Sequence, residues 1–199
     1  MHAWQAHPRL NPDFKNKGGS SYSDIGDAAH SLLLTGIDKR VIIDFDDYRK
    51  KEAQELRDKA YADGKIPILR DKASQIDDMI SALRCQPDKT DHARNAFKSD
   101  TSERTVIAKD GDVWLRCMID NYDDNFVYDY KTTSGYSEPE QWMKSNLFDG
   151  NHLQPVFYPR LLEMIDGKKR GFIFVVQEQV EPYAIFVVAL QPQALAVQQ

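Results

Sequence analysis

The hydrophobic pattern of the chain changes its period near residue 104, and this change constrains the fold more than any other feature. Before this point apolar side chains recur at three- and four-residue spacing, which is typical of amphipathic helices. From Thr105 to Thr132 they alternate every second residue, as expected for strands with one buried face. The sequence therefore predicts an α/β fold with helices flanking a mixed central β-sheet.

Helices are expected before the switch, and glycines mark where several of them end. The first begins at a Ser or Asp cap before Ile25, ends near Gly36 and carries His30. A short strand is expected over residues 41–43. Further helices are expected over residues 46–62, capped by Asp46 or Asp47, and over residues 71–83 and 88–97.

The alternating segment predicts three consecutive strands joined by tight turns, which form a β-meander. These strands are expected over residues 105–108, 113–120 and 126–132. Two helices are expected over residues 139–147 and 152–165, and two C-terminal strands over residues 171–177 and 183–190. We expect an irregular N-terminal arm over residues 1–22 and a single domain over residues 23–199.

Composition argues against several classes of protein, among them membrane proteins and basic DNA-coating proteins. The 199 residues carry a net charge of −5, which argues against a broadly basic DNA-coating protein. No apolar run approaches the roughly 20 residues that span a bilayer, and the first residues lack the features of an export signal, so a cytoplasmic location without membrane contact is expected. Cys85 and Cys117 are too few for a four-cysteine cluster, and we expect both thiols to be buried.

Asp120, Asp129 and Lys131 are the residues most suggestive of chemistry. Because alternate side chains of a strand share one face, Asp129 and Lys131 point the same way, and a hairpin partner would bring Asp120 beside them. Carboxylates bind hard cations such as Mg²⁺, and a nearby lysine can position an attacking water. The group suits metal-assisted hydrolysis of a phosphodiester. An exposed ion pair between Asp129 and Lys131 would explain the same residues without any function.

Three further polar residues lie on otherwise apolar helix faces. Gln154 and Tyr158 are four residues apart, on one face of the helix after the meander, from which they could reach a strand lysine or a phosphate. His30 lies on the apolar face of the first helix, where a histidine is more often a hydrogen-bonded core residue than a ligand. Pro155 and Pro159 are expected to delay or kink the Gln154 helix, which bears on the reach of Tyr158.

Taken in order, these segments resemble the PD-(D/E)XK nuclease superfamily, specifically its RecB-like branch and the exonuclease VIII (RecE-type) enzymes of phages and prophages. Four family motifs occur here in order: a G-x-x-x-H helix, a first acid, a second acid followed by a lysine, and a Q-x-x-x-Y helix. The matching residues are Gly26 and His30, Asp120, Asp129 and Lys131, and Gln154 and Tyr158. The resemblance covers most of the chain, although Met118 and Ile119 stand where the family often has an Arg and a Pro.

The resemblance implies a restriction-endonuclease-like core and a site for Mg²⁺ or Mn²⁺, with no iron–sulfur cluster. The metal ligands that it implies are His30, Asp120, Asp129 and the backbone carbonyl of Tyr130. The catalytic residues that it implies are Asp120, Asp129, Lys131, Gln154 and Tyr158, with Lys131 positioning the attacking water. Glu103 is a further ligand candidate, because the family often has an acid at the start of its first strand. A solvated residue at a strand edge is the alternative for Glu103.

The implied function is hydrolysis of phosphodiester bonds at the ends of double-stranded DNA, in phage-type recombination or DNA repair in a bacterial or phage-infected cell. The resemblance also makes possible a ring-shaped homo-oligomer and a recombination or annealing partner protein. Two alternatives stay open: a single-strand-specific or structure-selective endonuclease of the same superfamily, and a catalytically inactive DNA-binding module. The basic runs 49–51 and 168–170 could contact the DNA backbone or could be solvated faces.

Overall fold

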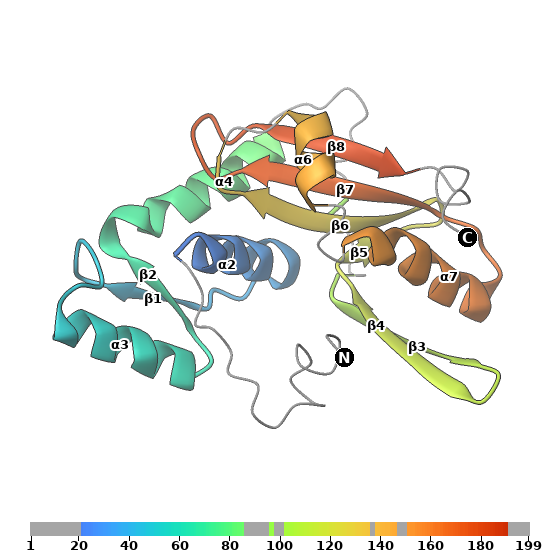
Figure 1. The fold of residues 1–199 in the computed structure, drawn as a ribbon, viewed down its shortest axis with the longest axis horizontal. Coiled ribbons are helices and arrows are strands. Elements are labelled where there is room, and N and C mark those ends of the chain that lie inside the picture. The colour runs from blue at the N-terminus through green and yellow to red at the C-terminus, as the bar shows by residue number, and fades with distance from the viewer. Residues whose placement is uncertain (1–20, 86–95, 98–101, 136–137, 147–150, 191–199) are drawn as a thin grey trace.

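The computed structural model describes residues 21–85, 96–97, 102–135, 138–146 and 151–190 (Figure 1). A four-stranded sheet in the order β5-β6-β7-β8 forms its centre. These strands are β5 (Asn121–Tyr122), β6 (Phe126–Thr133), β7 (Gly171–Glu178) and β8 (Ile185–Leu190). β6 and β7 run parallel, whereas β5 and β8 are antiparallel to their neighbours. The expected mixed sheet is confirmed.

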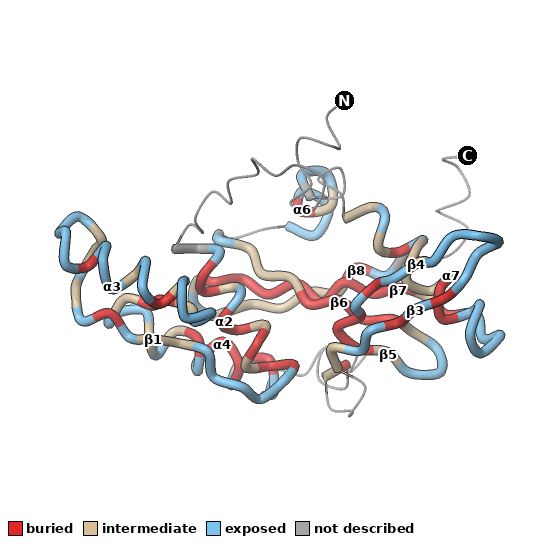
Figure 2. The backbone as a smooth tube through the Cα atoms, turned by 90° about the horizontal axis from the view of Figure 1, so that it is seen from below, coloured by how far each residue is buried: buried red, intermediate tan, exposed pale blue. Residues whose placement is uncertain are grey.

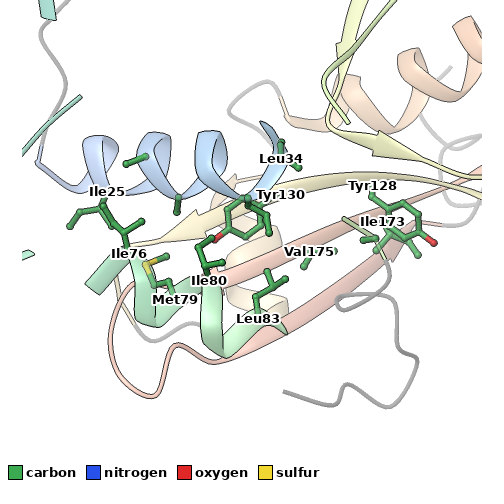
Figure 3. Packing of buried hydrophobic residues seen from close by; sticks show 14 of the residues in the cluster. Ile25, Leu34, Ile76, Met79, Ile80, Leu83, Tyr128, Tyr130, Ile173 and Val175 are labelled. Atoms are coloured by element: carbon green, nitrogen blue, oxygen red, sulfur yellow. The ribbon is translucent and has the colours of Figure 1, made fainter. Parts of the chain in front are cut away.

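Helices cover both faces of the central sheet, because its strands are apolar on both faces. α2 (Ser21–Thr35) and α4 (Ala73–Cys85) pack on one face against Tyr128, Tyr130, Ile173 and Val175, as Figure 3 shows. α6 (Pro139–Asn146) and α7 (Gln154–Asp166) pack on the other face against Val127, Phe172, Phe174 and Val176. Figure 2 shows these central strands as a largely buried layer.

A smaller β-α-β unit lies beside α2. β1 (Arg40–Ile43) and β2 (Ile66–Leu69) pair in parallel, α3 (Lys51–Ala62) connects them, and a 3₁₀ turn (Arg70–Lys72) leads into α4. Tyr61 of α3 donates a hydrogen bond of 2.8 Å to the buried Asp24 of α2. The sequence interpretation missed β2 and started α3 too early. Asp47 does not cap this helix, because its carboxylate accepts the N–H of Arg49 in a local turn instead.

The predicted meander is divided between two sheets. β3 (Arg104–Asp110) and β4 (Val113–Ile119) form a separate antiparallel hairpin, which extends beyond the central sheet in Figure 1. Asp120 separates β4 from β5, and only the two residues of β5 pair with β6. One face of the hairpin packs against α7 through Val106, Ala108, Cys117 and Ile119. This packing against a helix draws the hairpin away from the sheet.

The expectations for α7, for the two cysteines and for two further segments have different outcomes. α7 begins at Gln154 after a 3₁₀ turn (Asn151–Leu153), with Pro155 in its first turn, and ends at Gly167 with a φ of 73°. Cys117 is buried as expected, but Cys85 is exposed at the end of α4. The arm over residues 1–22 and the helix over residues 88–97 lie almost wholly outside the described residues. Within the described part, no helix is long and apolar enough to cross a membrane.

Candidate metal centre

The candidate site lies at the edge of the central sheet where β6 loses its partner strand. β5 pairs only with Val127 and Tyr128, and no other described strand pairs with that side of β6. From Asp129 onwards, β6 is therefore an edge strand. Helix α7 reaches Asp129 through Gln154, and helix α2 lines the same hollow as Lys131.

Three side chains from distant parts of the chain gather at this edge. The Nε2 atom of His30 lies 3.2 Å from Asp120 Oδ2, and its Nδ1 atom lies 3.4 Å from Glu103 Oε1. One potential ligand atom from each residue lies within 4.8 Å of the other two. One imidazole nitrogen and two carboxylates form a donor set that fits a divalent cation such as Mg²⁺, and fits the softer Mn²⁺ well.

Glu103 and Asp120 are held together at the base of the β3–β4 hairpin. The N–H of Glu103 donates to the carbonyl of Asp120 at 3.0 Å. The N–H of Tyr130 donates to Asp120 Oδ2 at 2.8 Å, so β6 also orients this carboxylate. Glu103 is half-buried and has a φ of 54°, a left-handed conformation that non-glycine residues adopt rarely and that is frequent at functional sites. The solvated strand edge is therefore the poorer description of Glu103.

Asp129 and Lys131 share one face of β6, as the alternation predicts, and their side chains form an ion pair. The Asp129 side chain is only 2% exposed, and its Oδ1 atom accepts a hydrogen bond of 3.1 Å from Gln154 Nε2. Gln154 Nε2 also contacts the Tyr158 hydroxyl at 3.2 Å. The prolines do not prevent this reach: Pro155 lies in the first turn, which tolerates proline, and Pro159 lies inside the helix but after Tyr158. Gln154 reaches the second acid, where we expected a lysine or a phosphate.

The structure thus arranges the predicted residues as two adjoining groups. His30 and Asp120 come together as expected, and Glu103 completes a cluster of three. Asp129 adjoins this cluster, but its oxygen atoms contact Lys131 and Gln154. Its assignment as a metal ligand, together with the Tyr130 carbonyl, stays a prediction.

The close approach of these charges shifts their pKa values. Burial, and next the charge of Asp120, raises the pKa of Asp129 against the opposing effect of Lys131. Burial alone would lower the pKa of His30, but the hydrogen bond and charge of Asp120, helped by Glu103 and Asp129, raise it overall. The folded protein therefore holds protons at this site more tightly than the unfolded chain does. A divalent cation would compete with them.

We expect the metal-free protein to lose stability as pH rises from about 4 to about 8. An acid whose pKa is raised by folding stabilises the fold fully below its unfolded pKa, here 3.8, and this contribution disappears as pH rises through the folded-state pKa. The raised pKa of His30 acts in the same direction, from its unfolded value of 6.5 upwards. Urea unfolding in EDTA at several pH values should show Asp129→Asn gaining stability relative to the wild type as pH rises.

Asp166→Asn is a control whose stability relative to the wild type should change with pH in the opposite direction. Arg170 lowers the pKa of Asp166 to about 2, so this carboxylate stabilises the fold above its unfolded pKa of 3.8. The control variant should therefore lose stability relative to the wild type as pH rises from 2 towards 5. A stability difference for Asp129→Asn that does not change with pH would contradict the expectation.

A hollow of about 330 Å³ opens beside the cluster, between α2 and β6. Its lining residues are Ser23, Gly26, Asp27, His30, Tyr130, Lys131 and Thr132. The sequence interpretation missed Ser23 and Asp27, although they precede His30 by seven and three residues and so share its helix face. Burial raises the pKa of the Asp27 carboxyl. The hollow exposes His30 and Lys131 to the same small space.

Gly26 allows α2 to lie close to β6, one helical turn before His30. A Cβ atom at Gly26 would lie 2.5 Å from Thr132 Oγ1. We therefore expect Gly26→Ala to push the helix outwards, to destabilise the protein by about 1–3 kcal/mol despite the higher helix propensity of alanine, and to weaken Mn²⁺ binding. Thr132→Ala removes the clashing atom, so the double variant should regain most of the lost Mn²⁺ affinity. Calorimetric titration checks this, and equal losses in the single and double variants would contradict it.

Comparisons with known proteins bear on the fold. No protein-family model matches the sequence, and no curated protein matches it. The structure is similar to a crystal structure from Eubacterium rectale described as "Putative exonuclease", with a TM-score of 0.64 and 13% sequence identity. The similarity covers 95% of this chain and 65% of that chain, so this chain spans just under two thirds of its neighbour. At this identity, the likeness shows the mixed α/β fold alone.

Proposed function

We propose that this protein is a metal-dependent deoxyribonuclease of the PD-(D/E)XK type that uses Mg²⁺ or Mn²⁺. The observation that carries the proposal is the clustering of His30, Glu103 and Asp120 at the sheet edge that also holds Asp129 and Lys131. The description of the structural neighbour as an exonuclease supports it. Fold similarity alone would not suffice, because one fold can host many functions.

In the proposed reaction, a water oxygen bonds to phosphorus, one bridging P–O bond breaks, and the departing oxygen takes up a proton. When bound by His30, Glu103 and Asp120, with Asp129 and the Tyr130 carbonyl beside them, a divalent cation supplies positive charge to the scissile phosphate.

The remaining residues act around that phosphate. Lys131 lines the hollow next to Asp129, where its amine can hold the attacking water. Gln154 orients Asp129, and Tyr158 orients Gln154.

The substrate that we propose is the end of double-stranded DNA, in phage-type recombination or DNA repair in the cytoplasm of a bacterial or phage-infected cell. A ring of several copies would hold the enzyme on its substrate during repeated cleavage. An annealing or recombination protein would receive the single strand that remains. The support for these details is the order and spacing of the family motifs around Asp120, Asp129 and Gln154.

Linear and circular DNA separate this function from its alternatives. The purified protein with Mg²⁺ or Mn²⁺ should degrade linear duplex DNA and leave closed circular duplex intact. In EDTA it should cleave neither DNA. Cutting of the closed circle would identify a structure-selective endonuclease instead. Cleavage of single strands alone would identify a single-strand-specific enzyme. Binding of DNA without cleavage of any substrate would identify an inactive binding module.

A further inference from the structure

The hairpin of β3 and β4 has an outer face that is both apolar and basic. The cross-strand pairs on this face are Thr105–Met118, Ile107–Arg116 and Lys109–Trp114. All six residues are exposed, because their neighbours in sequence form the opposite face of the hairpin that packs against α7. Trp114 is 69% exposed, more than any other large apolar residue of the described part. We refer to these six residues as the hairpin face.

The hairpin face is positively charged in a protein whose net charge is −5. It contains Lys109 and Arg116 and no acidic residue. Neither cation forms an ion pair with any residue that the structure describes. The Nζ atom of Lys109 lies 6.0 Å from the centre of the Trp114 ring. The face therefore offers cations and a flat aromatic ring together, and both suit a negatively charged partner that contains planar groups.

The two basic runs noted in the sequence are less available to such a partner. Their cations are largely paired with acids: Arg49 with Asp47, Lys51 with Glu55, Lys168 with Asp124, and Arg170 with Asp166. Arg170 is also buried, and it donates a hydrogen bond to the carbonyl of Asp123. Its role is structural. The hairpin face thus carries exposed charge that no acidic residue of the described ranges pairs with.

Both strands of the hairpin connect directly to residues of the candidate metal centre. Glu103 immediately precedes β3, and Asp120 immediately follows β4. Met118, at the near end of the face, is two residues from Asp120. At a rise of about 3.4 Å per residue, Trp114 lies about 20 Å from Asp120 along the strand. A polymer that lies along this face can therefore reach the metal centre.

We propose that the hairpin face binds single-stranded DNA, with Trp114 stacked on a base and Lys109 and Arg116 in contact with phosphates. An exposed indole stacks on a base of any sequence, and the bases inside a duplex have both ring faces covered by neighbouring pairs, which favours a single strand over the body of a duplex. The inference rests on the proposed function and deepens it, because it identifies where one strand of the substrate lies. The hairpin face is separate from the residues that hold the metal or the attacking water.

Binding of a fluorescent oligothymidylate in EDTA tests this inference without cleavage. Trp114→Ala should weaken binding about 5- to 150-fold, the range that loss of one base–aromatic stack spans. In a Trp4→Phe background, Trp114→Phe should retain most of the affinity but lose the quenching of tryptophan fluorescence by DNA, since the remaining Trp142 is buried. Lys109→Gln and Arg116→Gln should each reduce the slope of log affinity against log salt by about 0.7. Lys59→Gln, an exposed cation on α3, is the matched control and should change neither quantity.

Two outcomes would overturn the inference. The first is wild-type affinity in Trp114→Ala together with an unchanged salt slope in the two glutamine variants. The second is that Trp114→Ala dissociates an oligomer in sedimentation without any effect on oligonucleotide affinity, which would identify the face as a protein interface. Failure of the proposed function would look different. In that case the wild type would bind the oligonucleotide through Trp114 in EDTA but would cut no DNA with Mg²⁺ or Mn²⁺.

Discussion

Asp120→Asn is expected to lower the rate of metal-dependent DNA cleavage by about 10³-fold or more. Asp120 lies 3.2 Å from His30 and belongs to the cluster that can bind a cation. Asparagine keeps the size of the side chain, and its carbonyl oxygen can still accept the N–H of Tyr130, but it removes the negative charge. A bound ion contributes several kcal/mol of transition-state stabilisation, and its loss corresponds to a factor of this size.

Two measurements check this expectation. Initial rates on linear duplex DNA give the loss of activity, and calorimetric titration with Mn²⁺ in the absence of DNA should show binding to the wild type and none to Asp120→Asn. Asp112→Asn makes the same chemical change at the exposed tip of the hairpin and should leave both quantities near wild type. Wild-type Mn²⁺ affinity in Asp120→Asn would contradict the assignment of this residue as a ligand.

Lys131→Met is expected to lower kcat by about 10²- to 10⁴-fold while Mn²⁺ still binds. The Lys131 amine forms an ion pair with Asp129 and lines the hollow, but it is not one of the clustered ligands. Methionine keeps much of the side-chain length and its packing near Phe174. Because the charge of Lys131 lowers the pKa of Asp129, the variant should also need a higher pH for its residual activity.

The control separates this role of Lys131 from a structural one. Lys144→Met removes an exposed cation from α6 and should retain full activity. Single-turnover rates and Mn²⁺ titrations on both variants provide the comparison. If Lys131→Met lost Mn²⁺ affinity in proportion to its rate, Lys131 would be acting by organising the metal site, and its proposed contact with the attacking water would be wrong.

Local sequence patterns predicted the parts of the site that depend on one strand or one helix. Alternation placed Asp129 and Lys131 on one face of β6, and they form an ion pair there. Helical spacing placed Gln154 and Tyr158 on one face of α7, and their side chains meet. Both results follow from the geometry of a single element, which the sequence expresses directly.

Features of the fold and the site that depend on contacts between several elements could not be predicted from local sequence patterns. The division of the meander at Asp120 follows from packing of the hairpin against α7, a contact between distant segments. The inclusion of Glu103 in the cluster depends on its left-handed backbone and on its hydrogen bond to the Asp120 carbonyl. Neither has a local signal, because glutamate has no preference for positive φ. Parallel strand β2 is as short as β1, but Pro67 interrupts it, and a proline within an apolar run argues against a strand.

The short pairing between β5 and β6 also has a consequence for folding during synthesis. β6 pairs with β5 through only two residues, but with β7 along all eight of its residues. A strand with so little pairing is marginally stable in water, so β6 becomes ordered only once β7 is available. Because β7 follows α7 in the chain, a ribosome-bound chain already contains His30, Asp120 and Lys131 well before it can assemble them. The order of the strands therefore keeps these side chains apart until β7 has been synthesised.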